Sequence, residues 1–146
     1  MKKQTFFIIA AILITLFIWG NSMIPAHYSN MESNLVLSPV KKIANAHSGI
    51  TELPKIIVVF TRKSAHILEF ALQGFLLAGC FSGIFKKRII YVLFFGLMTA
   101  CIDEFIQLFP DGRAAMIQDV FFDFAGTVLG LLVFFFIYKL NQKRNI

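Results

Sequence analysis

Four long, nearly continuous apolar segments set the range of structures open to this chain. They lie at about residues 5–24, 65–85, 89–109 and 118–140. Each is about as long as the ~20 residues that an α-helix needs to cross a ~30 Å hydrocarbon core. Only helices and closed barrels satisfy their own backbone hydrogen bonds within lipid, and continuous apolar runs favour helices over alternating strands. The sequence therefore predicts an all-α membrane protein, with four transmembrane helices forming a single domain over residues 1–146.

The composition excludes several other classes of protein. Of the 146 residues, 58% are hydrophobic and only 15% are charged, whereas a soluble domain carries about 25% charged residues. A soluble core of this size could hardly bury the 18 phenylalanines. The net charge of +6 could suggest a nucleic-acid partner, but the basic residues lie between the apolar segments rather than in a patch. We therefore expect the lipid bilayer, and no nucleic acid, as a partner.

The positions of the basic residues also predict the orientation of the chain. Basic residues precede the first segment, separate the second from the third, and follow the fourth: Lys2, Lys3, Lys86, Lys87, Arg88, Lys139, Lys143 and Arg144. Because such residues are enriched on the cytoplasmic side, both termini are expected in the cytoplasm of a multi-pass protein of the cell membrane. The region 25–62 and the turn at Pro110–Arg113 are then external.

The first segment could be a signal peptide or a retained helix, and the loop after it could contain a helix of its own. The first segment is long for the apolar core of a signal peptide, and no Ala-x-Ala cleavage site follows closely. We therefore expect it to be retained as a helix. The external loop 25–62 contains prolines and polar residues, and its apolar positions around Leu35–Ala44 predict a short interfacial helix.

Three of the apolar segments carry polar residues three or four positions apart, a spacing that places them on one face of a helix. These residues are Arg62, His66, Glu69 and Gln73 in the second segment, Asp103 and Gln107 in the third, and Asp119 and Asp123 in the fourth. Glu104 lies next to Asp103 in the sequence and is turned about 100° away from it. In the fourth segment, Gly126 and Gly130 continue the same face at a spacing that permits close contact between helices.

The carboxyl groups of these three segments lie at a common depth. At about 1.5 Å per residue, Glu69, Asp103 and Asp123 each lie roughly 10 Å from the external end of their segment. Charged groups inside a membrane are costly and usually mark a functional site or a structural pair. The sequence therefore predicts an outward-facing polar pocket, with Arg62 and Arg113 at its rim.

Three arrangements could stabilise so many acids in one place. Arg62, Arg113 and His66 could neutralise them and hold the bundle together. The pocket could instead bind a ligand, with arginines holding an anion and a histidine or carboxyl group moving protons. A divalent cation held by His66 and carboxylates is the third arrangement, not favoured because no established metal-binding spacing is present.

The candidate residues fall into two groups. The candidates for catalysis are His66, Glu69, Asp103 and Glu104. The candidates for ligand binding are Arg62, Gln73, Gln107, Arg113, Asp119 and Asp123. The residues identify no cofactor, and they leave open whether the protein is an enzyme and in what oligomeric state it exists.

Two stretches of this sequence resemble the VanZ-like family. The stretch Arg62–Phe70 resembles its Lys-x-x-His-x-x-Glu-aromatic segment, and Asp103–Arg113 resembles its Asp-Glu-x-x-Gln-x-Phe-x-x-x-Arg segment. Asp119 and Gly126 match the aspartate and glycine that follow, so the resemblance covers residues 60–126. The sequence departs from the family at Asp123, where the family usually has asparagine.

The resemblance implies a small bacterial membrane protein of the cell envelope. The founding member of the VanZ-like family is associated with resistance to the glycopeptide teicoplanin. We therefore expect a contribution to glycopeptide resistance through a pocket that binds or processes an anionic or lipid-linked envelope ligand. The alternatives are a structural or partner-binding helical bundle whose acids form internal salt bridges, and a metal-assisted membrane enzyme acting on a lipid-linked substrate.

Overall fold

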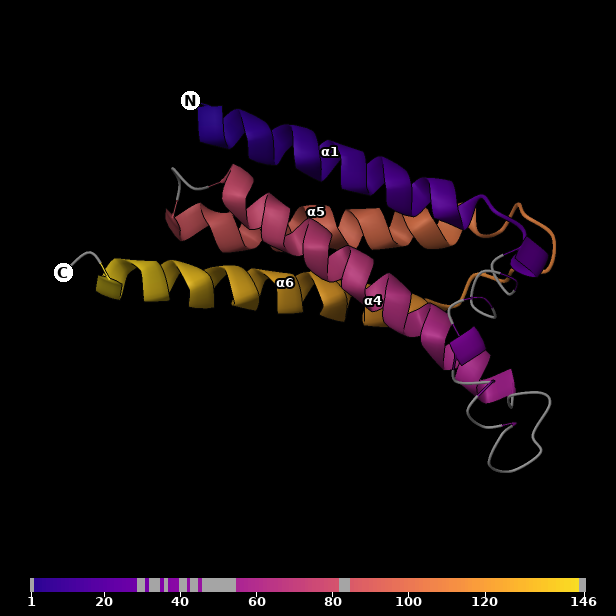
Figure 1. The fold of residues 1–146 in the computed structure, drawn as a ribbon. Coiled ribbons are helices and arrows are strands. Elements are labelled where there is room, and N and C mark those ends of the chain that lie inside the picture. The colour runs from indigo at the N-terminus through magenta and orange to yellow at the C-terminus, as the bar shows by residue number, and fades with distance from the viewer. Residues whose placement is uncertain are drawn as a thin grey trace.

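The computed structural model describes residues 2–28, 31, 35, 37–39, 42, 45, 55–81 and 85–144. Most of these residues are helical, and none of them lies in a strand. The long helices are α1 (Lys2–Ser22), α4 (Lys55–Cys80), α5 (Phe85–Ile106) and α6 (Ile117–Arg144). Figure 1 shows them running in alternating directions, so that both chain termini lie at one end of the bundle.

Three of these helices are long and apolar enough to cross a membrane, over Lys3–Ser22, Lys87–Ile106 and Ile117–Arg144. Large apolar side chains are exposed on their outer faces, including Phe6, Phe94 and Phe136. An apolar surface of this extent is expected where lipid replaces water around a protein. The all-helical membrane protein expected from the sequence is confirmed at this level. The expected crossing at 65–85 falls in α4, which is not among the three.

Two boundaries differ from those expected. Helix α4 begins at Lys55, so residues 55–62 are helical rather than part of the loop, because apolar residues continue up to Phe60 and the nearest proline is Pro54. Residues 86–88, expected to form the joint between two segments, lie in the first turn of α5. Most of the expected interfacial helix, around residues 35–44, lies outside the described residues.

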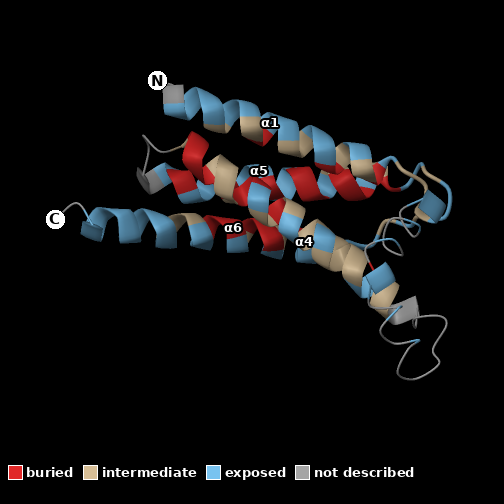
Figure 2. Ribbon diagram, viewed as in Figure 1, coloured by how far each residue is buried: buried red, intermediate tan, exposed pale blue. Residues whose placement is uncertain are grey.

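Helix α4 is central in the bundle and packs against α1, α5 and α6. Figure 2 shows the buried residues on the faces that the helices turn toward one another. Phe70 of α4 packs with Ile18 of α1 and Ala100 of α5 in one buried apolar cluster. A second cluster, nearer the termini, contains Ala78, Val92 and Leu131.

Glycines bring α4 and α6 into direct backbone contact. A Cβ atom added to Gly126 would lie 2.5 Å from the carbonyl oxygen of Ile67, and one added to Gly130 would overlap the carbonyl oxygen of Ala71. A Cβ atom on Gly74 of α4 would in turn meet the backbone of Thr127. The close contact expected from the spacing of Gly126 and Gly130 is therefore present, and α4 is its partner.

Arg88 is buried near the end of the bundle that carries the termini. The residue is 1% exposed, and its Nε donates a hydrogen bond to the carbonyl oxygen of Phe81 at 3.1 Å. Its guanidinium group lies over the rings of Phe134, Phe135 and Tyr138, at 5.3, 5.8 and 5.9 Å from their centroids. These cation–π contacts explain why the start of α5 packs inward rather than forming a loop.

Candidate functional site

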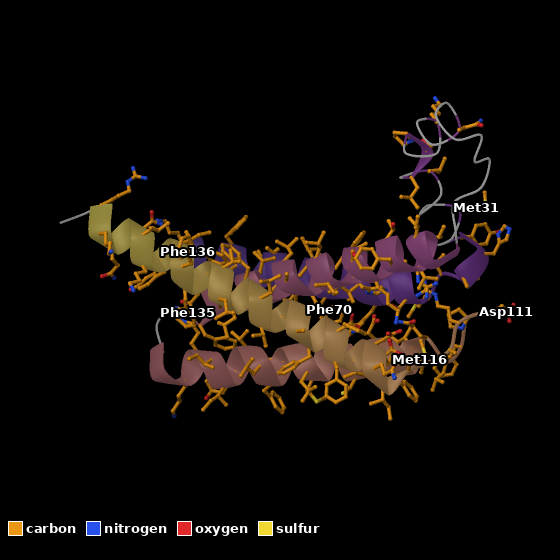
Figure 3. All side chains as sticks on the ribbon, turned by 90° about the horizontal axis from the view of Figure 1, so that it is seen from below. Met31, Phe70, Asp111, Met116, Phe135 and Phe136 are labelled. Carbon is orange, nitrogen blue, oxygen red and sulfur yellow. The ribbon has the colours of Figure 1, made fainter. Side chains whose placement is uncertain are left out.

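The polar faces of α4, α5 and α6 meet at the end of the bundle opposite the termini, which we call the polar end. Figure 3 shows Asp111 and Met116 at this end, and Phe135 and Phe136 toward the other. One ring nitrogen of His66 and one carboxylate oxygen each of Asp103 and Asp123 lie within 4.8 Å of one another. The convergence expected from the helical spacing therefore holds for one residue from each of the three helices.

A small polar cavity lies beside these three residues. Its volume is about 20 Å³, and it is lined by Arg62, Lys63, His66, Glu104, Gln107, Asp119, Phe122 and Asp123. A cavity of at least ~10–15 Å³ can hold one water molecule. The polar cavity can therefore accommodate a water molecule or a single ion, whereas a whole lipid head group could only lie across its opening.

Asp103 is the most enclosed of the acids, with 0% of its surface exposed. Its Oδ1 accepts a hydrogen bond of 2.6 Å from the hydroxyl of Ser22, at the end of α1. Its Oδ2 accepts one of 2.9 Å from the amide of Gln107. Helix α1 therefore takes part in the site, although the sequence predicted contributions only from the other three helices.

Glu104 joins α5 to the segment that leads into α6. Its Oε2 accepts a hydrogen bond of 2.7 Å from the backbone N–H of Met116, and its Oε1 accepts one of 3.2 Å from the amide of Gln107. A carboxylate bonded in this way holds the start of α6 against α5. Glu104 and Gln107 therefore order the site as well as lining its cavity.

His66 and Glu69 lie one helical turn apart on α4. The Nδ1 of His66 is 3.7 Å from Oε2 of Glu69, and neither atom has a hydrogen-bond partner among the described residues. The other carboxylate oxygen of Glu69 accepts a hydrogen bond of 3.0 Å from the amide of Asn21. The histidine ring and the carboxylate therefore face each other with donor and acceptor capacity left over.

The basic residues at the polar end have different surroundings. Lys63 forms an ion pair with Asp119 and lies 5.3 Å from the centroid of the Phe122 ring. Arg113 donates hydrogen bonds to the carbonyl oxygens of Ile24, at 2.7 Å, and Asn21, at 3.0 Å. Arg113 therefore anchors the end of α1, and its expected role in ligand binding remains a prediction.

Among the charged residues that line the polar cavity, Arg62 and Asp123 have no hydrogen bond or ion pair with the described residues. Asp123 is 4% exposed and makes no hydrogen bond or ion pair with the described residues. Arg62 lines the polar cavity and likewise makes no ion pair with them. A buried carboxylate usually needs such a partner, so the cavity beside Asp123 is where a cation or a proton would compensate its charge.

Gln73 lies farther inside the bundle than the polar cavity. It is 1% exposed, and its amide donates to the hydroxyls of Thr15 at 2.7 Å and Thr99 at 3.0 Å. It is the only expected ligand-binding residue that the structure places in a second, larger space. That apolar groove has a volume of about 720 Å³ and lies between α1, α4 and α5.

The lining of the apolar groove was not expected from the sequence. Its residues are Gln4, Ile8, Ala11, Ile12, Thr15, Leu16, Trp19, Gln73, Leu77, Cys80, Phe81, Phe94, Phe95, Met98, Thr99 and Ile102. Apolar helical faces look alike in sequence whether they pack together or leave a groove. For the polar end, by contrast, the sequence held a signal in the polar pair Asn21 and Ser22 at the end of the first segment, whose side chains bond Glu69 and Asp103.

The chain matches a model of a protein family. The model described as VanZ/LLP1 matches residues 7–138, which extends from α1 to the last turns of α6. No curated protein and no solved structure matches the chain.

Proposed function

The chain belongs to the VanZ/LLP1 family, and on that premise we propose that it binds an anionic, lipid-linked ligand of the bacterial cell envelope. Through this binding the protein would contribute to glycopeptide resistance, teicoplanin being the compound to test. The proposal needs a site with an apolar part for the lipid chain and a cationic part for the head group.

The observation that carries the proposal is the order of surfaces along one face of α4. Gln73 and Leu77 line the apolar groove. One to three turns nearer the polar end, the same face carries Glu69, His66 and Arg62. An amphiphilic ligand requires apolar and ionic surfaces within its own length, and α4 carries residues of both.

The apolar groove supplies the part of the site for the lipid chain. Its volume of about 720 Å³ lies within the range of ~300–1,000 Å³ that is typical of small-molecule sites. Along α1 its lining includes Leu16, which is 57% exposed on the protein surface. A lipid chain could enter from the bilayer along this surface without crossing the polar end.

The polar end supplies the part for the head group. Arg62 lines the opening of the polar cavity without an ion pair to the described residues, and a guanidinium group matches the oxygens of a phosphate. His66 and Glu69, whose facing atoms lack hydrogen bonds, are placed where a proton could be given or taken. The head group would lie across the opening of the cavity.

We also propose that α4 is the fourth membrane crossing, with both termini in the cytoplasm. Helix α4 has 26 residues and packs against all three apolar helices, which would shield its polar face from lipid. The basic residues near both termini favour the cytoplasmic side for them. The polar end would then face outward, where lipid-linked precursors of the cell wall are exposed.

A structural role is the second candidate function. Most acids at the polar end join helices: Asp103 accepts from Ser22, Glu104 from Met116 and Glu69 from Asn21. Such hydrogen bonds stabilise a bundle without any ligand. The two candidates differ in what they expect of Arg62, which makes no ion pair with the described residues, and of the exposed Leu16: a structural role predicts little effect of changing either.

The test compares two site variants with two matched controls in a glycopeptide-susceptible bacterium. Arg62→Gln removes a cation from the lining of the polar cavity, and Leu16→Trp places an indole ring at the apolar groove. Arg144→Gln and Leu13→Trp make the same changes at exposed positions outside the site. We expect only the two site variants to lose the rise in teicoplanin resistance, and native mass spectrometry to detect less bound anionic lipid. Equal resistance in all four, at equal membrane level, would favour the structural role.

A further inference from the structure

We propose that His66, Asp103 and Asp123 form a binding site for a divalent transition-metal ion. The site is defined by the protein's own ligands and does not depend on which lipid the chain binds. It brings one imidazole and two carboxylates together from three helices, so it exists only when α4, α5 and α6 are assembled.

The distances between the three ligand atoms are close to those of a metal site. They lie within 4.8 Å of one another. Around Zn²⁺, with bonds of about 2.0 Å, tetrahedral ligand atoms are about 3.3 Å apart. Each pair therefore has to approach by at most about 1.5 Å for tetrahedral binding.

The charges of the site call for a cation. Asp103 and Asp123 are both buried, and two carboxylates side by side repel each other strongly in a medium of low dielectric constant. Lys63 is already paired with Asp119, Arg62 lines the same cavity without an ion pair to the described residues, and Asp123 has no hydrogen bond or ion pair with them. A divalent ion would balance the two charges and give the buried, unpartnered Asp123 its missing contact.

The residues behind the ligands are arranged to orient them. Ser22 and Gln107 donate hydrogen bonds to the two oxygens of Asp103, which fixes the plane of that carboxylate while leaving lone pairs free. Glu69 faces Nδ1 of His66 at 3.7 Å. Metal-binding histidines commonly have a carboxylate behind one ring nitrogen, and in this arrangement Nε2 would be the ligand atom.

The polar cavity would provide an open coordination position. His66 and Asp123 both line it, and its volume of about 20 Å³ leaves room for one water molecule. Three protein ligands plus one exchangeable position are typical of catalytic zinc sites. Imidazole together with carboxylates favours Zn²⁺ or Mn²⁺ over Mg²⁺, which prefers oxygen ligands alone.

The test measures Zn²⁺ binding to the purified full-length chain after removal of metals with EDTA. Cys80 and Cys101 are replaced by serine throughout, so that thiols cannot bind the ion. Isothermal titration should show one Zn²⁺ per chain, with Mg²⁺ binding far more weakly. Even substitutions behind the ligands lower metal affinity about 10- to 100-fold, so Asp123→Asn and His66→Gln should each weaken Zn²⁺ binding at least tenfold.

Two further variants keep the result interpretable. Asp111→Asn makes the same acid-to-amide change on the exposed turn between α5 and α6 and should keep the affinity of the parent. If a ligand variant does not fold, Glu69→Gln, which leaves all three ligands in place, should still weaken binding about 10- to 100-fold. The proposal is overturned if the parent protein binds no stoichiometric Zn²⁺, or if it binds no more tightly than the folded Asp123→Asn or Glu69→Gln variant.

Discussion

Arg62 and Arg113, which the sequence places together at the rim of one pocket, have different roles in the structure. Arg113 is engaged by backbone carbonyl groups at the end of α1, whereas Arg62 lines the polar cavity. A carbonyl-rich helix C-terminus attracts a guanidinium group because the free carbonyl groups carry partial negative charge. The two arginines therefore differ in role because their neighbouring groups differ.

We predict that Arg113→Met destabilises the protein without removing an acid from the site. The substitution loses two hydrogen bonds from a charged donor to Asn21 and Ile24, and the free energy of unfolding should fall by about 2 kcal/mol. Thermal unfolding in mild detergent measures the effect, with Arg144→Met as the control. An unchanged melting temperature would show that Arg113 does not anchor α1.

For single residues, the sequence predicted that polar side chains of three helices meet, but not which hydrogen bonds fix each side chain. Helical spacing places Glu69, Asp103 and Asp123 at one depth and His66 on the same face as Glu69, and the structure brings His66, Asp103 and Asp123 together. Hydrogen-bond partners from α1 could not be predicted, because the spacing of a helix contains no information about its neighbour. The burial of Arg88 was missed for a different reason. A basic residue between two apolar segments usually lies in a loop.

Among the elements, the contact between α4 and α6 sets the geometry of the site. Gly74, Gly126 and Gly130 allow the two backbones to touch, which brings His66 on α4 close to Asp123 on α6. Contact of this kind depends on the absence of side chains. The spacing of Gly126 and Gly130 predicted a close contact, but it could not identify α4 as the partner helix.

We predict that Gly130→Ala pushes α4 and α6 apart. The new Cβ would overlap the carbonyl oxygen of Ala71 and lie 2.8 Å from the backbone nitrogen of Phe75. Overpacking of this kind costs about 1–3 kcal/mol, which unfolding in detergent can measure.

Gly20→Ala is the matched control for this change, because nothing lies within 4 Å of the added atom. Alanine is favoured over glycine inside a helix by about 0.5–1 kcal/mol, so the control should be neutral or slightly more stable. Equal stability of the two variants would contradict the close packing of α4 and α6.

For the molecule as a whole, the number of crossings determines where the two termini lie. Figure 1 shows both termini at one end of the bundle, an arrangement that fits four crossings. If only the three most apolar helices crossed, the termini would lie on opposite sides. The sequence predicted four crossings, one of them at residues 65–85. Helix α4 carries polar residues along one face and is not among the three helices apolar enough to cross, so that crossing stays a prediction.

We predict that a thiol at the carboxy-terminal end is protected in intact cells, while one at the turn between α5 and α6 is accessible. Gln142→Cys and Asp111→Cys, each in a background without Cys80 and Cys101, can be treated with a maleimide that does not cross membranes. Only the Asp111→Cys protein should be labelled before lysis, and both after it. Labelling of Gln142→Cys in intact cells would reverse the proposed orientation of α6.

The site exists only if polar faces from separate helices converge at one place. Cysteines introduced together at His66 and Asp123, in the same background without native cysteines, test it in native membranes with a short thiol cross-linker. We expect efficient cross-linking for this pair and very little for Leu68→Cys with Asp123→Cys, since Leu68 lies on the exposed face of α4. Equal cross-linking of the two pairs, or none in either, would contradict the convergence.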